Sequence, residues 1–148
     1  MKTNNLKMRN ALQLLLILFI SMFANAQTEL KEQRINDLPT INMSNGVNIH
    51  FISPEPVQFV DLSTYKMIGD LPSENIARVK ISDKNVNDSL NLKKKELTFY
   101  PGEDIGIITV VGQSFMAQYR AIYAQEGNKN IITNIQIQPE DMQPLEFP

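Results

Sequence analysis

His50 is the only histidine of the chain, so a Ser-His-Asp catalytic triad would have to use it. The surrounding segment alternates apolar and polar residues, which places His50 with Asn48 on the polar side of a strand. A solvent-facing position is therefore favoured over a catalytic one. A hydrolase that depends on His50 is nevertheless kept as one hypothesis.

Paired carboxylates occur at Glu103-Asp104 and at Glu140-Asp141. General acid–base catalysis needs two carboxyl groups that converge in a cleft and experience different environments. Both pairs instead lie beside turn-forming or proline residues, where solvated acids are expected. The chain has no cysteine, and one histidine supplies too few ligands for a zinc site. We therefore expect no enzyme activity, no metal and no cofactor.

Met116, Gln118 and Arg120 are the candidates for contact with a partner protein. They lie on the mixed face of an alternating segment, 115–123. Arginine is enriched at interfaces because its planar guanidinium makes several directed hydrogen bonds. The opposite face is predicted to pack in a core, and it consists of Phe115, Ala117, Tyr119, Ala121 and Tyr123.

The first 26 residues have the three parts of a secretory signal. A positively charged N-terminal region is followed by an apolar run at 11–23. This run is shorter than the roughly 20 residues that span a bilayer. The small residues Ala24 and Ala26 form a cleavage site before Gln27. We expect cleavage there and export of the remaining 122 residues, which suit one domain. The basic residues of the start are Lys2, Lys7 and Arg9.

Cleavage would remove these three cations and no acid, so the formal charge would change from −2 to −5. Binding to nucleic acid or to anionic lipid needs clustered positive charge, and the only basic run is Lys93-Lys94-Lys95. We interpret that run as a solvated loop. No direct contact with nucleic acid is expected.

From Ile41 onward the sequence predicts short strands, because β-branched and aromatic residues alternate with polar ones between Pro- and Gly-containing turns. Apolar residues on both faces of 105–111 predict a central strand that is covered on both sides. The expected fold class is all-β, an antiparallel β-sandwich or barrel of seven to eight short strands. Strands are expected at 47–51, 57–62, 64–68, 76–81, 97–100, 105–111, 115–123 and 131–137, and a turn at 69–72.

The predicted organisation is a signal peptide at 1–26, a flexible segment at 27–40, a β-sandwich domain at 41–138 and a Pro-rich tail at 139–148. The tail cannot continue a central strand, since proline lacks the N–H that a ladder needs. We expect it to begin a linker to a missing C-terminal part.

Four segments have distinctive sequences. They are SPEPVQFVDLS at 53–63, GDLPSENI at 69–76, GQSFMAQYR at 112–120 and PEDMQPL at 139–145. In this order and spacing they resemble the TraN family of conjugative transposon proteins from Bacteroides-type bacteria. The resemblance covers about 41–148, and it corresponds to the N-terminal portion of that family's longer proteins.

The resemblance implies a structural, non-enzymatic subunit of a conjugative DNA-transfer apparatus, a type IV secretion system. It implies a place in the periplasm, in an outer-membrane core, with a distant similarity to CagX-type subunits. The implied partners are TraM-like and outer-membrane core proteins, together with further copies in a homo-oligomeric ring. Membrane association would come through these partners. The mixed face of 115–123 and the Pro-rich tail are the expected docking surfaces.

An alternative function is a free periplasmic module that binds a small ligand or a glycan. Such a module needs a concave pocket with converging polar groups. The sequence does not reveal a pocket, so this alternative stays open beside the structural subunit and the hydrolase.

Overall fold

The computed structural model describes residues 32–82 and 97–145. The expected signal peptide, with Ala24, Ala26 and Gln27, lies outside the described residues. The basic run at 93–95 lies outside them as well.

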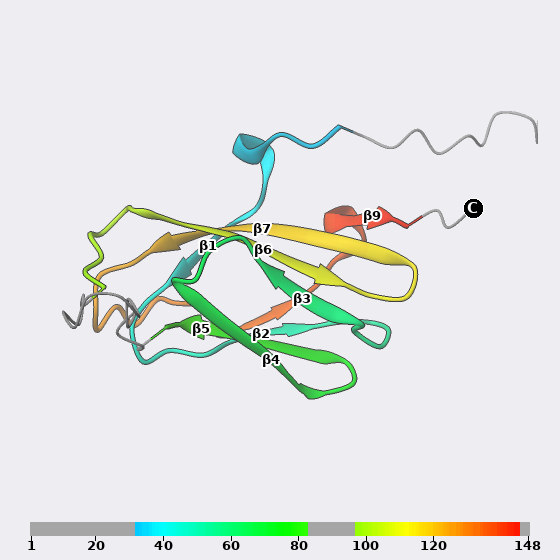
Figure 1. Cartoon of the computed structure of the whole chain (residues 1–148), viewed down its shortest axis with the longest axis horizontal. Coiled ribbons are helices and arrows are strands. Elements are labelled where there is room, and N and C mark those ends of the chain that lie inside the picture. Colours follow the sequence, from blue (N-terminus) through cyan, green and yellow to red (C-terminus); the bar gives the residue numbers. More distant parts are fainter. Residues whose placement is uncertain (1–31, 83–96, 146–148) are drawn as a thin grey trace, which may run out of the picture. The chain divides into compact units, whose positions relative to one another are not determined.

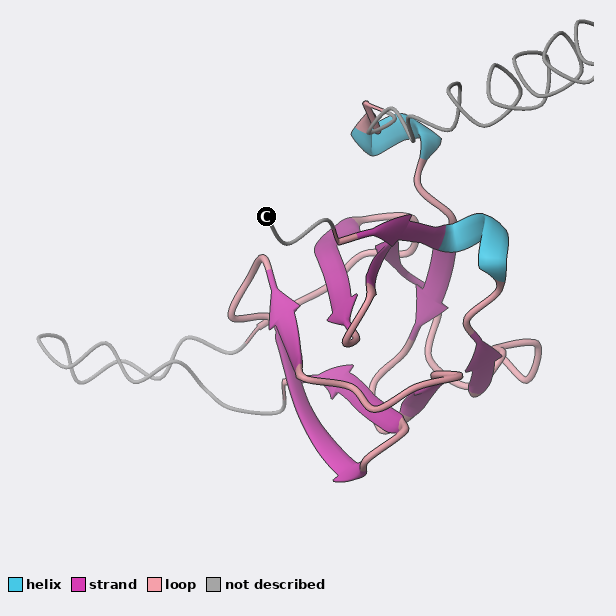
Figure 2. Cartoon of the chain, turned by 90° about the vertical axis from the view of Figure 1, so that its right-hand side faces the viewer, coloured by secondary structure: helices cyan, strands magenta, loops and turns pink. Residues whose placement is uncertain are grey.

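Two β-sheets pack face to face, and Figures 1 and 2 show them as two layers. Sheet A has the order β1-β7-β6-β3, with β9 also paired to β7, and sheet B has the order β4-β5-β2-β8. The strands are β1 (Thr40–Met43), β2 (Ile49–Ile52), β3 (Phe59–Leu62), β4 (Met67–Ser73), β5 (Ile76–Ile81), β6 (Asp104–Val111), β7 (Phe115–Tyr123), β8 (Asn134–Gln136) and β9 (Met142–Pro144). Two short 3-10 helices are η1 (Ile35–Asp37) and η2 (Pro139–Asp141).

The all-β class is confirmed, but the strand pairing is mixed instead of wholly antiparallel. β1 runs parallel to β7, and β8 runs parallel to β2. The other pairs are antiparallel. Alternation of apolar residues predicts which side of a strand is buried, but it carries no information about the direction of the neighbouring strand.

The core lies between the sheets and is built from the inward faces of their strands. In β5 and β7 the expected alternation is confirmed, since every second residue is buried. Phe51 of β2 meets Tyr119 of β7 across the sandwich, with ring centroids 5.0 Å apart. Each large apolar side chain buried here contributes about 1.5–3 kcal/mol.

β6 differs from the expected doubly covered strand because of a bulge. The pairing to β7 shifts between Asp104 and Gly106, so Ile105, Ile108 and Val110 all face the core. Gly106 has a φ of +144°, and a Cβ there would lie 2.7 Å from Ser63 Oγ. The outer face of β6 is only half-buried, with Ile107, Thr109 and Val111. The strand is central in sheet A, and the bulge is the reason that Ile105 faces the core together with Ile108 and Val110, whereas Ile107 and Val111 lie on the half-buried outer face.

The expected turn at 69–72 is instead part of β4. Pro72 is tolerated because β4 is an edge strand and its register to β5 shifts between Asp70 and Ser73. The expected strand at 97–100 has no ladder partner among the described residues. The last expected strand, 131–137, is reduced to β8.

The prediction for the Pro-rich tail is also corrected in part. Its residues Met142 to Pro144 form β9, which pairs antiparallel with Phe115–Ala117 of β7. Three residues ending in proline suffice for an edge strand, where one side of the ladder needs no donor. This part of the tail is therefore an edge strand of sheet A and belongs to the β-sandwich.

Candidate functional site

The four motif segments meet at one end of the sandwich, although up to 92 positions separate them in the sequence. The N–H of Ser53 donates to the Asn75 carbonyl at 2.9 Å, which joins the first segment to the second. Gln58 N–H donates to Val111 O at 2.7 Å, at the edge of the third segment. Leu145 N–H donates to Ser114 O at 2.8 Å, which joins the fourth segment to the third. We call this region the motif end.

A carboxylate organises the motif end. Glu55 Oε1 accepts a hydrogen bond from Ser114 N–H at 2.6 Å, and Glu55 Oε2 accepts one from Ser114 Oγ at 2.8 Å. The backbone bond is the main reason that the pKa of Glu55 lies below its usual value, since it stabilises the anion. Gly112 leaves room for this contact, because a Cβ there would lie 2.5 Å from Glu55 Oε1.

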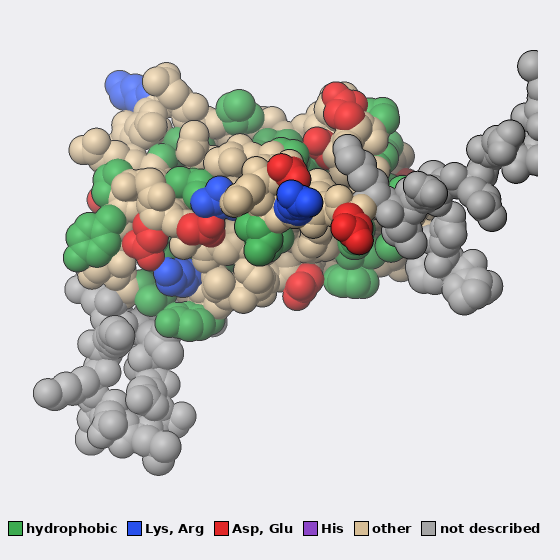
Figure 3. All heavy atoms as spheres, turned by 90° about the horizontal axis from the view of Figure 1, so that it is seen from above, with side chains coloured by type: hydrophobic (Ala, Val, Ile, Leu, Met, Phe, Trp, Pro, Cys, Tyr) green, Lys and Arg blue, Asp and Glu red, His purple; other side chains and the backbone are tan. Residues whose placement is uncertain are grey.

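The outer face of sheet A begins at the motif end, and Figure 3 looks onto this side of the sandwich, where hydrophobic side chains are interspersed with charged ones. Strand register places Phe59, Val111, Met116 and Gln143 in one row across four strands. Phe59 is 54% exposed, and Met116 and Val111 are half-buried. Apart from Gln143, this row is an apolar strip on the outer face of the sheet.

In the next two rows on the same face, β7 contributes polar side chains. Gln118 lies opposite Thr109, and its Nε2 donates to Thr109 Oγ1 at 3.3 Å. Arg120 lies opposite Ile107, and its Nε donates to Asp104 Oδ2 at 2.6 Å. The Arg120 and Asp104 side chains keep 32% and 46% of their exposure, so each keeps contact with solvent. An exposed pair of this kind adds at most about 1 kcal/mol to stability.

The structure thus places Met116, Gln118 and Arg120 together on one face, in successive rows. Phe59 belongs to the same surface but was missed by sequence reasoning. The segment 57–62 is apolar at alternate and at adjacent positions, so the periodicity alone does not say that Phe59 points outward. Phe59 lies in the same row as Met116, with Val111 between them, and exposed aromatic side chains are a residue type that is enriched at interfaces.

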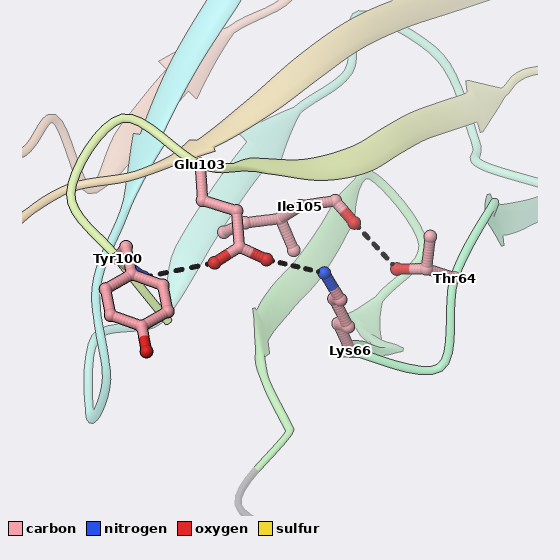
Figure 4. Close-up of polar contacts among 5 residues, drawn as sticks. All are labelled: Thr64, Lys66, Tyr100, Glu103 and Ile105. Atoms are coloured by element: carbon pink, nitrogen blue, oxygen red, sulfur yellow. Dashed lines mark hydrogen bonds and ion pairs between the residues drawn. The ribbon is translucent and has the colours of Figure 1, made fainter. Parts of the chain in front are cut away.

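The candidate carboxylate pairs do not converge. Asp104 holds Arg120, whereas Glu103 accepts hydrogen bonds from Lys66 Nζ at 2.8 Å and Tyr100 N–H at 3.1 Å (Figure 4). The Lys66 bond is the main reason that the pKa of Glu103 is lowered. Thr64 Oγ1 also donates to the Ile105 carbonyl, at 2.9 Å. These contacts tie the turn before β6 to the segment before β4.

In the second pair, Asp141 accepts a hydrogen bond from the Tyr119 hydroxyl at 3.2 Å. Burial, together with this nearby carboxylate, raises the pKa of Tyr119. The bond attaches η2 to a residue of the core, immediately before β9. The role is structural, since Tyr119 is only 2% exposed.

His50 lies on the outer face of sheet B, between Arg78 of β5 and Asn134 of β8. Neither neighbour is a nucleophile for a hydrolase. Within residues 32–82 and 97–145, no three side chains of the metal-binding types are grouped to hold an ion. In the same part of the chain, no helix has the length and apolar character needed to cross a membrane.

No protein-family model matches the chain, and no curated protein matches it.

Proposed function

We propose that this protein is an exported, structural and non-enzymatic subunit of a conjugative DNA-transfer apparatus, in the periplasmic outer-membrane core of a type IV secretion system. Its partners would be other subunits of that apparatus, including TraM-like and outer-membrane core proteins, and further copies of itself in a ring. The outer face of sheet A is the proposed contact surface.

The observation that carries this proposal is the row formed by Phe59, Val111 and Met116, which is followed on the same face by Gln118 and then Arg120 in the next two rows. The row has an exposed aromatic anchor, and directed polar groups lie next to it, which is the composition of a protein interface. The strands beneath it are packed against the core on their other side, so little ordering would be needed on binding.

The motif end supports the same proposal. The four segments that resemble the TraN family are not scattered over the fold, and their contacts with one another hold the start of β7 and the start of β3 in place. These are the strands that present Met116 and Phe59. The motif segments therefore position the surface to which we assign partner binding.

The test combines a mating assay with co-purification of the transfer complex. The gene is deleted and complemented with the unchanged protein or with Arg120→Glu. We expect the unchanged protein to restore transfer, and Arg120→Glu to lose most partner recovery because it places a second anion beside Asp104. A normal yield of partners and of mating with Arg120→Glu would contradict the assigned surface, and mating without the gene would contradict the function.

Arg78→Glu is the matched control. Arg78 also forms an exposed ion pair with an aspartate, Asp70, but it lies on the outer face of the other sheet. The two variants reverse the same charge in the same kind of ion pair. A loss of partner recovery that is confined to Arg120→Glu therefore reports on the outer face of sheet A.

A free ligand-binding module is the second candidate, and one feature favours it: a hollow on the outer face of sheet B. A chain that binds a ligand and is dispensable for DNA transfer would support this candidate over the structural subunit.

A further inference from the structure

The outer face of sheet B contains a hollow of about 310 Å³. This volume lies at the lower end of the range for small-ligand sites. An apolar side chain, an amide and three charged groups border it. The lining residues are Asn48, Ile68, Gly69, Asp70, Arg78 and Lys80.

Strand register explains why these groups share one face. Asp70 of β4 lies opposite Arg78 of β5, which in turn lies opposite His50 of β2. One row further along, Ile68 lies opposite Lys80. Side chains of β4 and β5 therefore border the hollow together with Asn48, which lies just before β2, although about thirty residues separate Asn48 and Lys80 in the sequence.

Asp70 holds the Arg78 side chain in one orientation. Arg78 Nε donates to Asp70 Oδ1 at 2.8 Å, and Arg78 Nη2 donates to Asp70 Oδ2. These two bonds are the main reason that the pKa of Asp70 is lowered, and the positive charge of Lys80 adds to the effect. Both partners are therefore ionised at neutral pH, and the pair is kept on the sheet surface.

This contact uses only one edge of the guanidinium. The Nε–Nη2 edge faces Asp70, so the N–H groups on the Nη1–Nη2 edge are directed elsewhere. Two parallel N–H donors match the two oxygens of a carboxylate or of a phosphate group, which gives a bidentate pair. Arg78 therefore has one edge for orientation by Asp70 and a second edge suited to a ligand.

We infer that this hollow is a binding site for a small ligand that carries a carboxylate or phosphate group. The Nη1–Nη2 edge of Arg78 binds the oxyanion, the Asn48 amide lies beside it as a further hydrogen-bonding group, and Ile68 contacts the less polar part of the ligand. This inference does not depend on the role in DNA transfer, because it concerns the other sheet.

The test is a titration of the purified, ¹⁵N-labelled protein, followed by NMR, with D-glucuronate, inorganic phosphate and D-glucose in separate arms. We expect shifts at the backbone amides of 68–70 and 78–80 and at the Arg78 Nε–H, with a Kd of about 1 mM or tighter. A response to glucuronate identifies a carboxylate ligand, and a response to phosphate alone identifies a phosphate-bearing one. D-glucose has no oxyanion and should give no such shifts.

Two variants locate the binding. Arg78→Gln should weaken it at least about tenfold, because the charged fork is lost. Arg78→Lys keeps the charge but not the fork, so it should still bind at least about fivefold more weakly than the unchanged protein. Lys129→Gln, in an exposed turn, should bind normally. The inference is overturned if neither anion shifts these amides, or if Arg78→Lys binds as tightly as the unchanged protein.

Discussion

Glu55 and Ser114 are 59 positions apart in the sequence, yet two hydrogen bonds join them at the motif end. One carboxylate thereby connects the segment before β3 to the turn between β6 and β7. Ser114 in turn accepts a hydrogen bond from Leu145, just after β9. The start of β7, which carries Met116, is thus held from two sides by segments distant in the sequence.

Replacing Glu55 should destabilise this end of the sandwich. Glu55→Gln keeps the size of the side chain but removes the charge and one acceptor, so we expect a loss of about 1 kcal/mol in the free energy of unfolding. Urea denaturation followed by circular dichroism measures it. Glu126→Gln is the control, because Glu126 is an exposed acid in the loop after β7. Equal stability of the two variants would argue against a structural role for Glu55.

The same contact predicts a dependence of stability on pH. The pKa of Glu55 is lowered in the folded state, so the folded protein binds its proton at a lower pH than the unfolded chain does. The contribution is fully present above the ordinary glutamate value of 4.5 and is lost as the pH falls through the lower folded value. Urea unfolding at a series of pH values should therefore show a smaller acid-side loss for Glu55→Gln. Parallel curves for the two proteins would contradict this linkage.

The bulge in β6 should not accept a side chain. Gly106→Ala forces a residue with a Cβ to adopt a φ of +144° and brings that Cβ to 2.7 Å from Ser63 Oγ. We expect a loss of about 2–3 kcal/mol, measured by thermal or urea unfolding. Gly127→Ala separates strain from collision, since Gly127 also has a positive φ, +77°, but no atom within 4 Å. It should cost about 1 kcal/mol. A Gly106 variant no less stable than the Gly127 variant would show that the close approach is unimportant.

The Tyr119 hydroxyl should hold η2 and β9 in place. Tyr119→Phe keeps the ring that packs on Phe51 but removes the hydrogen bond to Asp141. We expect faster hydrogen–deuterium exchange at 139–145, detected by mass spectrometry, and a modest loss of stability, about 1 kcal/mol. Tyr65→Phe serves as the control because Tyr65 is 67% exposed. Unchanged exchange at 139–145 would mean that the β9 ladder alone retains this segment.

The candidate contact face was predictable in part. Met116, Gln118 and Arg120 follow from the alternation of β7, because a residue's side of a strand depends only on its position in the period of two. Phe59 and Gln143 join them through pairing with other strands, and that pairing depends on residues far away in the sequence. The hollow on sheet B was not predictable for the same reason, since it combines side chains of β4 and β5 with Asn48 from the segment before β2.

Local sequence patterns by themselves determined the all-β class and the inward faces of β5 and β7. They also determined which residues of β7 lie on its outer face. These features follow from burial of apolar side chains on one side of a strand, which is a property of each segment alone. Only the tertiary structure decided the parallel pairing of β1 with β7 and of β8 with β2, the bulge at Gly106 and the use of the Pro-rich tail as an edge strand. Strand direction, register and edges depend on which hydrogen-bonding partners are available, and those partners are brought together only when the whole sandwich closes around its core.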